Sequence, residues 1–177
     1  MLTRRGDYLV RAALCLAGAW EEGGRRKIRE VSAAMDLPRG YTPTILRMLA
    51  KAGLATAKAG KGGGYRLARA PHEITLLEVV ETGEGPLAPT RCTLRGGPCH
   101  WEKACAVHPN WAALADAVRT SLAGTTLADL VRVDQELTQG TFVPDSPHAQ
   151  PRARGGSRRG GSRAGSGARS GARRPTP

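Results

Sequence analysis

Residues 28–67 read IREVSAAMDLPRGYTPTILRMLAKAGLATAKAGKGGGYRL, and this stretch decides the fold. Its first part predicts a short helix that ends before Pro38. A second helix is predicted from about Tyr41, because Pro43 is acceptable in the first turn of a helix. Two short helices joined by a tight turn indicate a helix-turn-helix. Ile28, Val31 and Met35 mark one face of the first helix, and the residues expected to face inward on the second are Ile45, Met48 and Leu49.

The second part of the stretch predicts a β-hairpin. Residues 55–58 and 65–67 have strand character and flank a glycine-rich turn at residues 60–64. Gly53 is expected to be a left-handed helix cap, with Leu54 folding back on the last turn. A nucleotide-binding loop is the alternative for the glycines, but such loops lead directly into a helix. We therefore expect a winged helix-turn-helix, a mainly α fold with a small β wing.

The charge of the chain is concentrated in the same region. The 177 residues carry a formal charge of +12, and residues 25–69 hold eleven Lys and Arg against Glu30 and Asp36. Such a basic chain indicates a polyanionic partner, and here the excess of positive charge coincides with a predicted DNA-binding fold. No run of about 20 apolar residues is present, so a membrane span is excluded. We expect double-stranded DNA as the partner.

The candidate DNA contacts lie at the start of the second helix and on the wing. Side chains at the start of a recognition helix reach base edges, and basic wing residues suit phosphates. A solvated basic face is the alternative interpretation for any one of them. The candidates are Arg39, Tyr41, Thr42, Thr44, Arg47, Lys58, Lys61 and Arg66.

The chain divides into four predicted parts. Residues 1–82 form the DNA-binding domain, which begins with a helix over about residues 6–20, and residues 83–109 form a cysteine-rich loop. Residues 110–140 form a long helix and a short closing helix. Residues 141–177 hold eight Arg and one acidic residue, and their Gly/Ser-rich composition predicts disorder. This tail is either a solubilising extension or a sequence-independent phosphate tether.

The long helix predicts a homodimer. Its apolar residues repeat at helical spacing and form a stripe that a small winged domain cannot fully cover. The alternative is that the stripe packs back on its own domain. Capping-box patterns at residues 75–78 and 126–129 predict the starts of two further helices. The stripe consists of Trp111, Leu114, Ala115, Val118 and Leu122.

Three cysteines and a histidine follow the pattern Cys92-x6-Cys99-x5-Cys105-x2-His108. Asp7 and Arg11 interrupt an apparent signal peptide, so we expect a cytoplasmic protein whose cysteines stay reduced. Thiolates select zinc, copper(I) or iron–sulfur clusters, and the wide spacing suits a cluster better than one tetrahedral ion. Reduced structural thiols are the alternative. The fourth cysteine, Cys15, is expected to be a buried small apolar residue.

Several motifs together resemble the Rrf-type family of bacterial winged-helix transcriptional regulators, with its IscR-like and NsrR-like branches. They are RGDYLVRA at residues 5–12, GKGGGYRL at 60–67, the three cysteines, and TTLADLV at 125–131. The resemblance covers residues 1 to about 137. It implies a dimeric repressor with an iron–sulfur cluster on Cys92, Cys99 and Cys105. Cluster state would control operator binding in response to nitric oxide, redox state or cluster supply.

The resemblance also implies a fourth ligand, for which the chain offers two candidates. His108 matches the IscR-like pattern, and Asp7 matches the NsrR-like one. The context Gly6-Asp7-Tyr8, with Arg11 one turn on, favours Asp7.

Other functions remain as alternatives to a cluster-controlled repressor. The first is a cluster-free regulator of the same family, and the second is a zinc-stabilised nucleic-acid-binding protein. An enzyme is not expected, because no local motif places an oxyanion or orienting group beside a Cys and His pair.

Overall fold

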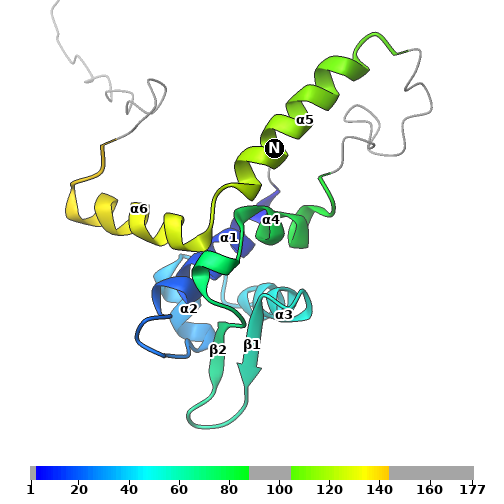
Figure 1. The fold of residues 1–177 in the computed structure, drawn as a ribbon. Helices are drawn as coiled ribbons and strands as arrows, with labels where there is room; N and C mark the ends of the chain where they lie inside the picture. The colour runs from blue at the N-terminus through cyan, green and yellow to red at the C-terminus, as the bar shows by residue number, and fades with distance from the viewer. Residues whose placement is uncertain (1–2, 88–104, 144–177) are drawn as a thin grey trace, which may run out of the picture. The chain divides into compact units, whose positions relative to one another are not determined.

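The computed structural model describes residues 3–87 and 105–143 of the chain. Cys92, Cys99 and the tail from residue 144 lie outside the described residues. The predicted class, mainly helical with a small wing, is confirmed (Figure 1). None of the described helices is long and apolar enough to cross a bilayer. The elements are α1 (Arg4–Gly18), α2 (Ile28–Ala34), α3 (Thr42–Lys51), β1 (Ala55–Lys58), β2 (Gly64–Leu67), the 3-10 turn η1 (Pro71–Glu73), α4 (Leu76–Glu84), α5 (His108–Ala123) and α6 (Leu127–Gln139).

Helix α1 is the centre of the core. Leu9, Ala12, Ala13 and Leu16 are buried on it, and α1 packs on α2, α3, α4, α6 and strand β2. The helix begins and ends two residues earlier than predicted. It starts earlier because Thr3 acts as its N-cap, with a hydroxyl that accepts a 3.3 Å hydrogen bond from the Gly6 amide.

Helices α2 and α3 form the predicted helix-turn-helix. Gly53 has φ +74°, and the Leu54 amide donates to the Leu49 carbonyl at 3.0 Å, which confirms the left-handed cap. Leu54 is buried, as expected. On the predicted apolar face of α2, Val31 is buried, whereas Ile28, the first residue of the helix, is 37% exposed. Ser32 is buried in α2 instead, where its hydroxyl donates to the Leu37 carbonyl at 2.7 Å.

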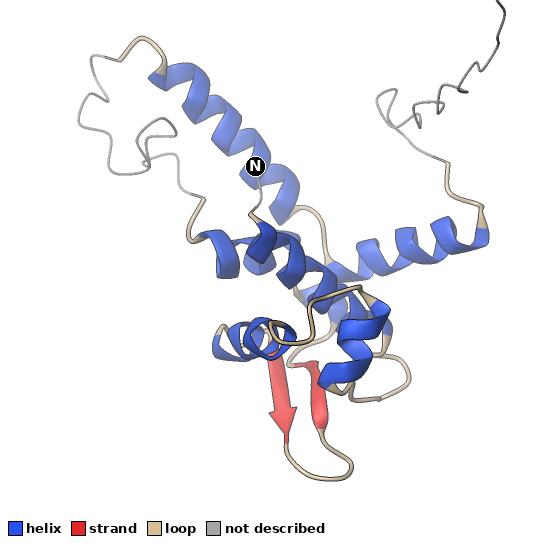
Figure 2. Ribbon diagram, turned by 180° about the vertical axis from the view of Figure 1, so that it is seen from behind, coloured by secondary structure: helices blue, strands red, loops and turns tan. Residues whose placement is uncertain are grey.

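Strands β1 and β2 form the predicted hairpin. They pair antiparallel with Ala55 opposite Leu67 and Lys58 opposite Gly64, and Figure 2 shows them side by side, joined by the loop. Tyr65 also forms an antiparallel bridge with Arg26, in a segment that the sequence predicts as a loop. The wing therefore has a third short contact at its base.

Both predicted capping boxes are confirmed. Thr75 caps α4 together with Glu78, and Thr126 caps α6 together with Asp129. Helix α5 ends at Ala123 with Gly124 as its C-cap, at the break that the sequence predicts. Helix α4 continues to Glu84, so the predicted domain boundary after residue 82 falls inside a helix.

Candidate functional site

Helix α3 presents one apolar face to the core and a polar face to solvent. Ile45, Leu46 and Leu49 are fully buried, which orients the helix on α1. Arg47 is exposed on the other side, and its Nη2 donates to the Thr44 hydroxyl at 3.3 Å. The turn before α3 leaves Arg39 exposed as well. Arg39 and Arg47 are therefore both accessible to solvent.

Thr42 lies in a different environment from the other candidate DNA contacts. Its side chain is fully buried, and its hydroxyl donates to the Pro38 carbonyl at 3.0 Å. The bond therefore ties the first residue of α3 to the preceding turn, and the buried side chain has no exposed surface with which to contact a base. Thr42 belongs to the framework of the helix-turn-helix.

Tyr41 is partly exposed and rests against α1. Its ring lies edge-on to the ring of Tyr8, with centroids 6.0 Å apart. Such aromatic pairs contribute about 0.5–1.5 kcal/mol beyond their buried area. The contact fixes the start of α3 relative to the first helix.

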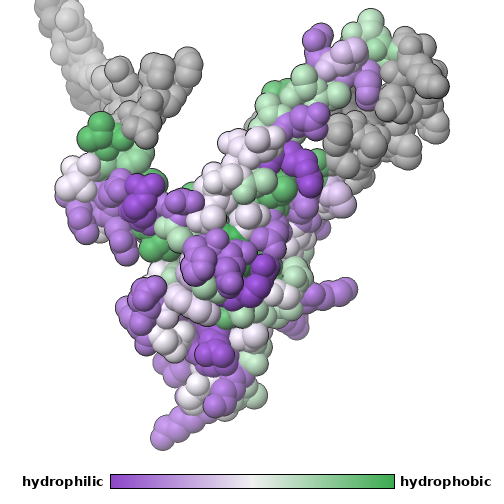
Figure 3. Space-filling view, in the orientation of Figure 1, coloured by the Kyte–Doolittle hydropathy of each residue, from purple (hydrophilic) through white to green (hydrophobic). Residues whose placement is uncertain are grey.

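The wing carries three exposed cations, Lys58, Lys61 and Arg66. Figure 3 shows the hydrophilic residues at the tip of the wing, at the bottom of the view. The turn is narrow enough to require glycine, because a Cβ added at Gly63 would lie 2.8 Å from the carbonyl carbon of Ala59. The sequence placed these cations on the wing, and the structure leaves them accessible.

Two arginines at the base of the wing are not among the sequence-based candidates. The Arg25 Nη1 donates to the carbonyls of Gly64 at 3.2 Å and of Thr56 at 3.4 Å. The Arg26 amide donates to the Tyr65 carbonyl at 2.8 Å. Arginines that bond to the backbone of a hairpin leave no periodic pattern in the sequence. The basic run before α2 is the signal in the sequence that points to them.

The possible cluster ligands within the described residues come from α1 and from the start of α5. Asp7 lies in the first turn of α1, where its Oδ1 accepts a 3.0 Å hydrogen bond from Arg11. Cys105 is half-buried, and its carbonyl accepts from the backbone amide of His108 at 3.2 Å. Within the described ranges, no three potential ligands gather at one point.

Cys15 does not belong to this set. It is buried in α1, as predicted, and burial raises the pKa of its thiol. The thiol therefore stays protonated at neutral pH.

The first turn of α1 is fastened to the last turn of α4. The Glu84 carboxylate accepts from the Thr3 amide at 2.9 Å and from the Thr3 hydroxyl at 2.6 Å. A Cβ added at Gly83 would lie 3.3 Å from the Cα of Gly6, so the two helices are in close contact. The helix end that bears Asp7 thus adjoins the point where the chain leaves α4 toward the cysteines.

Glu81 joins this point to the long helix. Its Oε1 accepts from the Leu87 amide and from the Arg119 Nη1 of α5, both at 3.0 Å. Helix α5 packs on α4 and has no fully buried residue. Leu114 and Val118 of its apolar stripe are 51% and 43% exposed.

Known proteins are similar to this chain in sequence and in fold. Residues 2–133 match the model of the Rrf2 family, an iron-dependent transcriptional regulator. The chain is 32% identical over 138 residues to the HTH-type transcriptional regulator IscR of Aliivibrio salmonicida, which covers 78% of this chain and 80% of that protein. It is 29% identical over 138 residues to an rrf2-like HTH-type transcriptional regulator of Rhodobacter capsulatus, covering 74% and 92%.

Two solved structures are similar. The structure of T. potens IscR has a TM-score of 0.62 at 25% identity and covers 78% of this chain and 90% of that one. The structure of CymR, the global cysteine regulator of B. subtilis, has a TM-score of 0.61 at 27% identity and covers 75% and 96%. The winged helix-turn-helix and these similarities agree, and the chain belongs to the Rrf2 family, whose members are transcriptional regulators and not enzymes.

Proposed function

We propose that this protein is a DNA-binding repressor that binds a palindromic operator as a homodimer under the control of an iron–sulfur cluster. The observation that carries the proposal is the continuous placement of exposed cations on α3 and on the hairpin that follows it. Arg47, Lys58, Lys61 and Arg66 are all exposed. Helix α3 and β1 are joined through the buried Leu54. The recognition helix and the wing are therefore packed together and contact a duplex as one unit.

The two groups of side chains have different tasks on DNA. Arg39, Tyr41, Thr44 and Arg47 contact base edges and adjacent phosphates from the start of α3. The wing cations contact phosphates, which supplies affinity without sequence information. The homodimer forms through the exposed apolar stripe of α5 and places two recognition helices on two half-sites.

The donor chemistry fits an iron–sulfur cluster on Cys92, Cys99 and Cys105, with Asp7 as the fourth ligand. Cys105 is accessible at the end of the loop. Among the described residues, the Asp7 carboxylate forms an exposed ion pair with Arg11, which contributes less than about 1 kcal/mol and can be exchanged for a stronger ligand. When bound, a cluster supplies a centre that reacts with oxidants or nitric oxide. His108 is the competing fourth ligand.

The chain offers a route from the loop to the dimer helix. Glu81 holds the backbone at Leu87 and the guanidinium of Arg119 with one carboxylate oxygen. A rearrangement of the loop that moves Leu87 therefore changes the contact that positions α5. A shift of α5 alters the spacing of the two recognition helices, on which operator binding depends.

Metal analysis of anaerobically purified protein tests the cofactor. We expect iron with acid-labile sulfide, and loss of visible absorbance in the Ala variants of Cys92, Cys99 and Cys105. Cys15→Ala is the matched control and keeps its absorbance. Zinc without sulfide would favour the zinc-stabilised nucleic-acid-binding protein. Protein that contains neither and still binds its operator would favour the cluster-free regulator.

The fourth ligand is tested by comparing Asp7→Ala with His108→Ala. We expect Asp7→Ala to change the circular dichroism of the cluster and its reaction with nitric oxide. An effect of His108→Ala alone would assign the ligand to His108.

DNA binding is tested with the triple Ala variant of Lys58, Lys61 and Arg66. Each lost phosphate contact lowers the slope of log affinity against log salt by about 0.9. The control is Arg132→Ala, which removes an exposed arginine from α6. Equal binding by the triple variant and the wild type would overturn the proposed DNA interface.

A further inference from the structure

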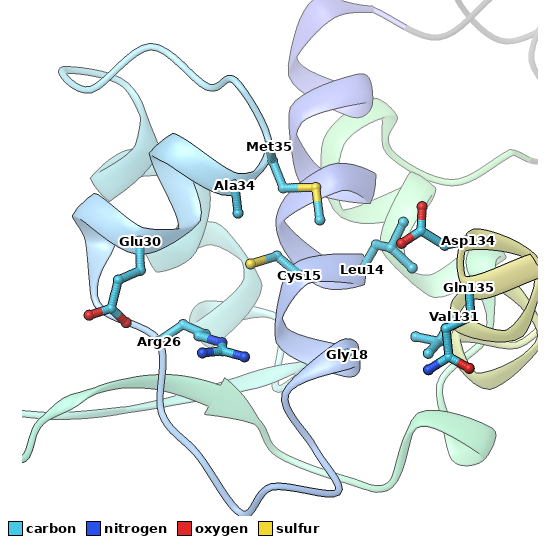
Figure 4. A pocket seen from close by; sticks show the side chains of 10 residues that line it. All are labelled: Leu14, Cys15, Gly18, Arg26, Glu30, Ala34, Met35, Val131, Asp134 and Gln135. Carbon is cyan, nitrogen blue, oxygen red and sulfur yellow. The ribbon is translucent and has the colours of Figure 1, made fainter. Parts of the chain in front are cut away.

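A cleft of about 400 Å³ lies between α1, α2 and α6 (Figure 4). It shares no residue with the proposed DNA contacts or cluster ligands. Its volume is in the range of small-molecule sites in proteins, roughly 300–1,000 Å³. The proposed function leaves this cleft unexplained.

The cleft has an apolar floor and a charged rim. Cys15 is buried at the floor, and Met35 lies beside it in Figure 4. Figure 4 shows Arg26 and Glu30 on one side and Asp134 on the opposite side. The rim residue Asp134 is exposed, so the cleft is open to solvent there. This combination of a few charged groups around an apolar floor is typical of sites for small polar molecules.

The rim carries an excess of negative charge. Arg26 is paired with Glu22 at 3.0 Å, so its charge is already partly compensated. Glu30 accepts a 3.0 Å hydrogen bond from the Lys27 amide. Over residues 3–87 and 105–143, neither Glu30 nor Asp134 forms an ion pair. An ammonium group is therefore the complementary ligand group, while the other N–H groups of Arg26 suit a carboxylate.

The floor disfavours a metal ion or a covalent ligand. The Cys15 thiol stays protonated, because burial raises its pKa and the nearby Glu30 adds to this effect against the opposing charge of Arg26. A protonated thiol packs as a small apolar group. With Met35 it forms a surface for an aliphatic side chain.

We propose that this cleft binds a free α-amino acid with a medium-sized apolar side chain. Its ammonium group lies between Glu30 and Asp134, on the two sides of the cleft, its carboxylate contacts Arg26, and its side chain lies on Cys15 and Met35. This inference goes beyond the proposed function, because it adds a second ligand at a different place.

The location of the cleft connects such a ligand to DNA binding. Glu30 and Met35 belong to α2 or follow it directly, and α2 supports the recognition helix. The backbone of Arg26 is hydrogen-bonded to the backbone of Tyr65 in the wing. A ligand held between these residues and α6 therefore favours one placement of the helix-turn-helix over others.

Isothermal titration calorimetry of the full chain tests the proposal with three probes. L-methionine carries both charged groups, n-butylamine carries only the ammonium group, and butyrate carries only the carboxylate. We expect L-methionine to bind, n-butylamine to bind more weakly and butyrate not to bind. No DNA is present, so the result is independent of operator binding.

Substitutions on the rim locate the site. Asp134→Asn and Glu30→Gln preserve shape, and Gln at position 30 keeps an acceptor for the Lys27 amide. Each is expected to weaken L-methionine binding about tenfold or more, since each removes a charged hydrogen-bond partner. Asp116→Asn, on the exposed side of α5, is the charge-matched control and leaves binding unchanged.

Three results would overturn the proposal. The first is the absence of binding heat from any probe at concentrations up to about 10 mM, which corresponds to an affinity too weak for a specific binding site. The second is wild-type affinity in both rim variants. The third is binding of n-butylamine or butyrate as tight as that of L-methionine, which would exclude the paired recognition of both charged groups.

Discussion

Thr75 and Thr126, the N-cap residues of α4 and α6, pair with each other across an antiparallel bridge. The Leu76 amide donates to the Thr125 carbonyl at 2.8 Å. The first amides of a helix have no partner inside it, and here the two helix starts satisfy part of each other's need. The bridge also brings together the two ends of the segment 75–126, which contains α4, the cysteine-rich loop and α5. Helix α6, which starts at this bridge, packs on α1 and forms one wall of the cleft beside Cys15.

Removal of the α6 cap should destabilise the fold. The Thr126 hydroxyl donates to the Asp129 carboxylate at 2.7 Å and accepts from its amide at 3.2 Å. We expect Thr126→Ala to lower the free energy of unfolding by about 1 kcal/mol, measured by urea denaturation. The control Thr138→Ala removes an exposed hydroxyl on the same helix and should cost less than about 0.5 kcal/mol. A larger loss in the control would contradict the role of the cap.

The contact between Thr3 and Glu84 should make stability depend on pH. Partial burial acts to raise the pKa of Glu84, but the hydrogen bonds from Thr3 outweigh it and hold the pKa below its usual value. A lowered pKa in the folded state stabilises the protein above the unfolded pKa of about 4.3, and the gain is lost as pH falls further. Wild type should exceed Glu84→Gln in stability at pH 7 by less than about 1 kcal/mol. The difference should shrink below about pH 4 in chemical denaturation, and an unchanged difference would argue against this contact.

The wing turn provides a pair of matched glycine variants. A Cβ at Gly63 would collide with the backbone of Ala59, whereas one at Gly62 meets nothing within 4 Å. We expect Gly63→Ala to weaken DNA binding by about tenfold or more, about 1.4 kcal/mol, because the turn must open. Gly62→Ala should bind as wild type does. Equal affinities in a gel-shift titration, with unchanged helical circular dichroism, would show that the wing shape does not matter.

Two threonines near the start of α3 should behave differently. Thr42→Val removes a buried hydrogen bond to Pro38 and should lower stability by about 1 kcal/mol without changing base preference. Thr44→Ala should change the preferred bases by about 1–3 kcal/mol of discrimination. Selection from a randomised duplex library measures the preference. An altered preference in Thr42→Val would contradict its assignment to the framework.

Short-range features of this protein are predictable from its sequence. The cap at Gly53 and the capping boxes at Thr75 and Thr126 formed where the residues indicate, because each depends on hydrogen bonds within one turn. The hairpin formed for the same reason, since its glycine-rich turn joins strands that are adjacent in the chain.

Side-chain burial was predicted less well. Ile28 lies on the apolar side of its helix pattern but at the first position of α2, where it stays 37% exposed. Thr42 has a polar side chain in a basic region but is enclosed between the turn and the core. Periodicity identifies which face of a helix is apolar, but not how far a neighbouring element extends over it.

Contacts between distant residues were decided by the tertiary structure alone. The bridge of Thr75 with Thr126, the bond of Thr3 with Glu84 and the cleft beside Cys15 each join segments far apart in the chain. None of them has a local signal, because the residues involved are individually ordinary. Ordering such contacts costs chain entropy that only the burial of several helices around α1 can offset. The sequence by itself therefore determined the elements and the family resemblance, whereas packing around α1 determined which polar groups meet.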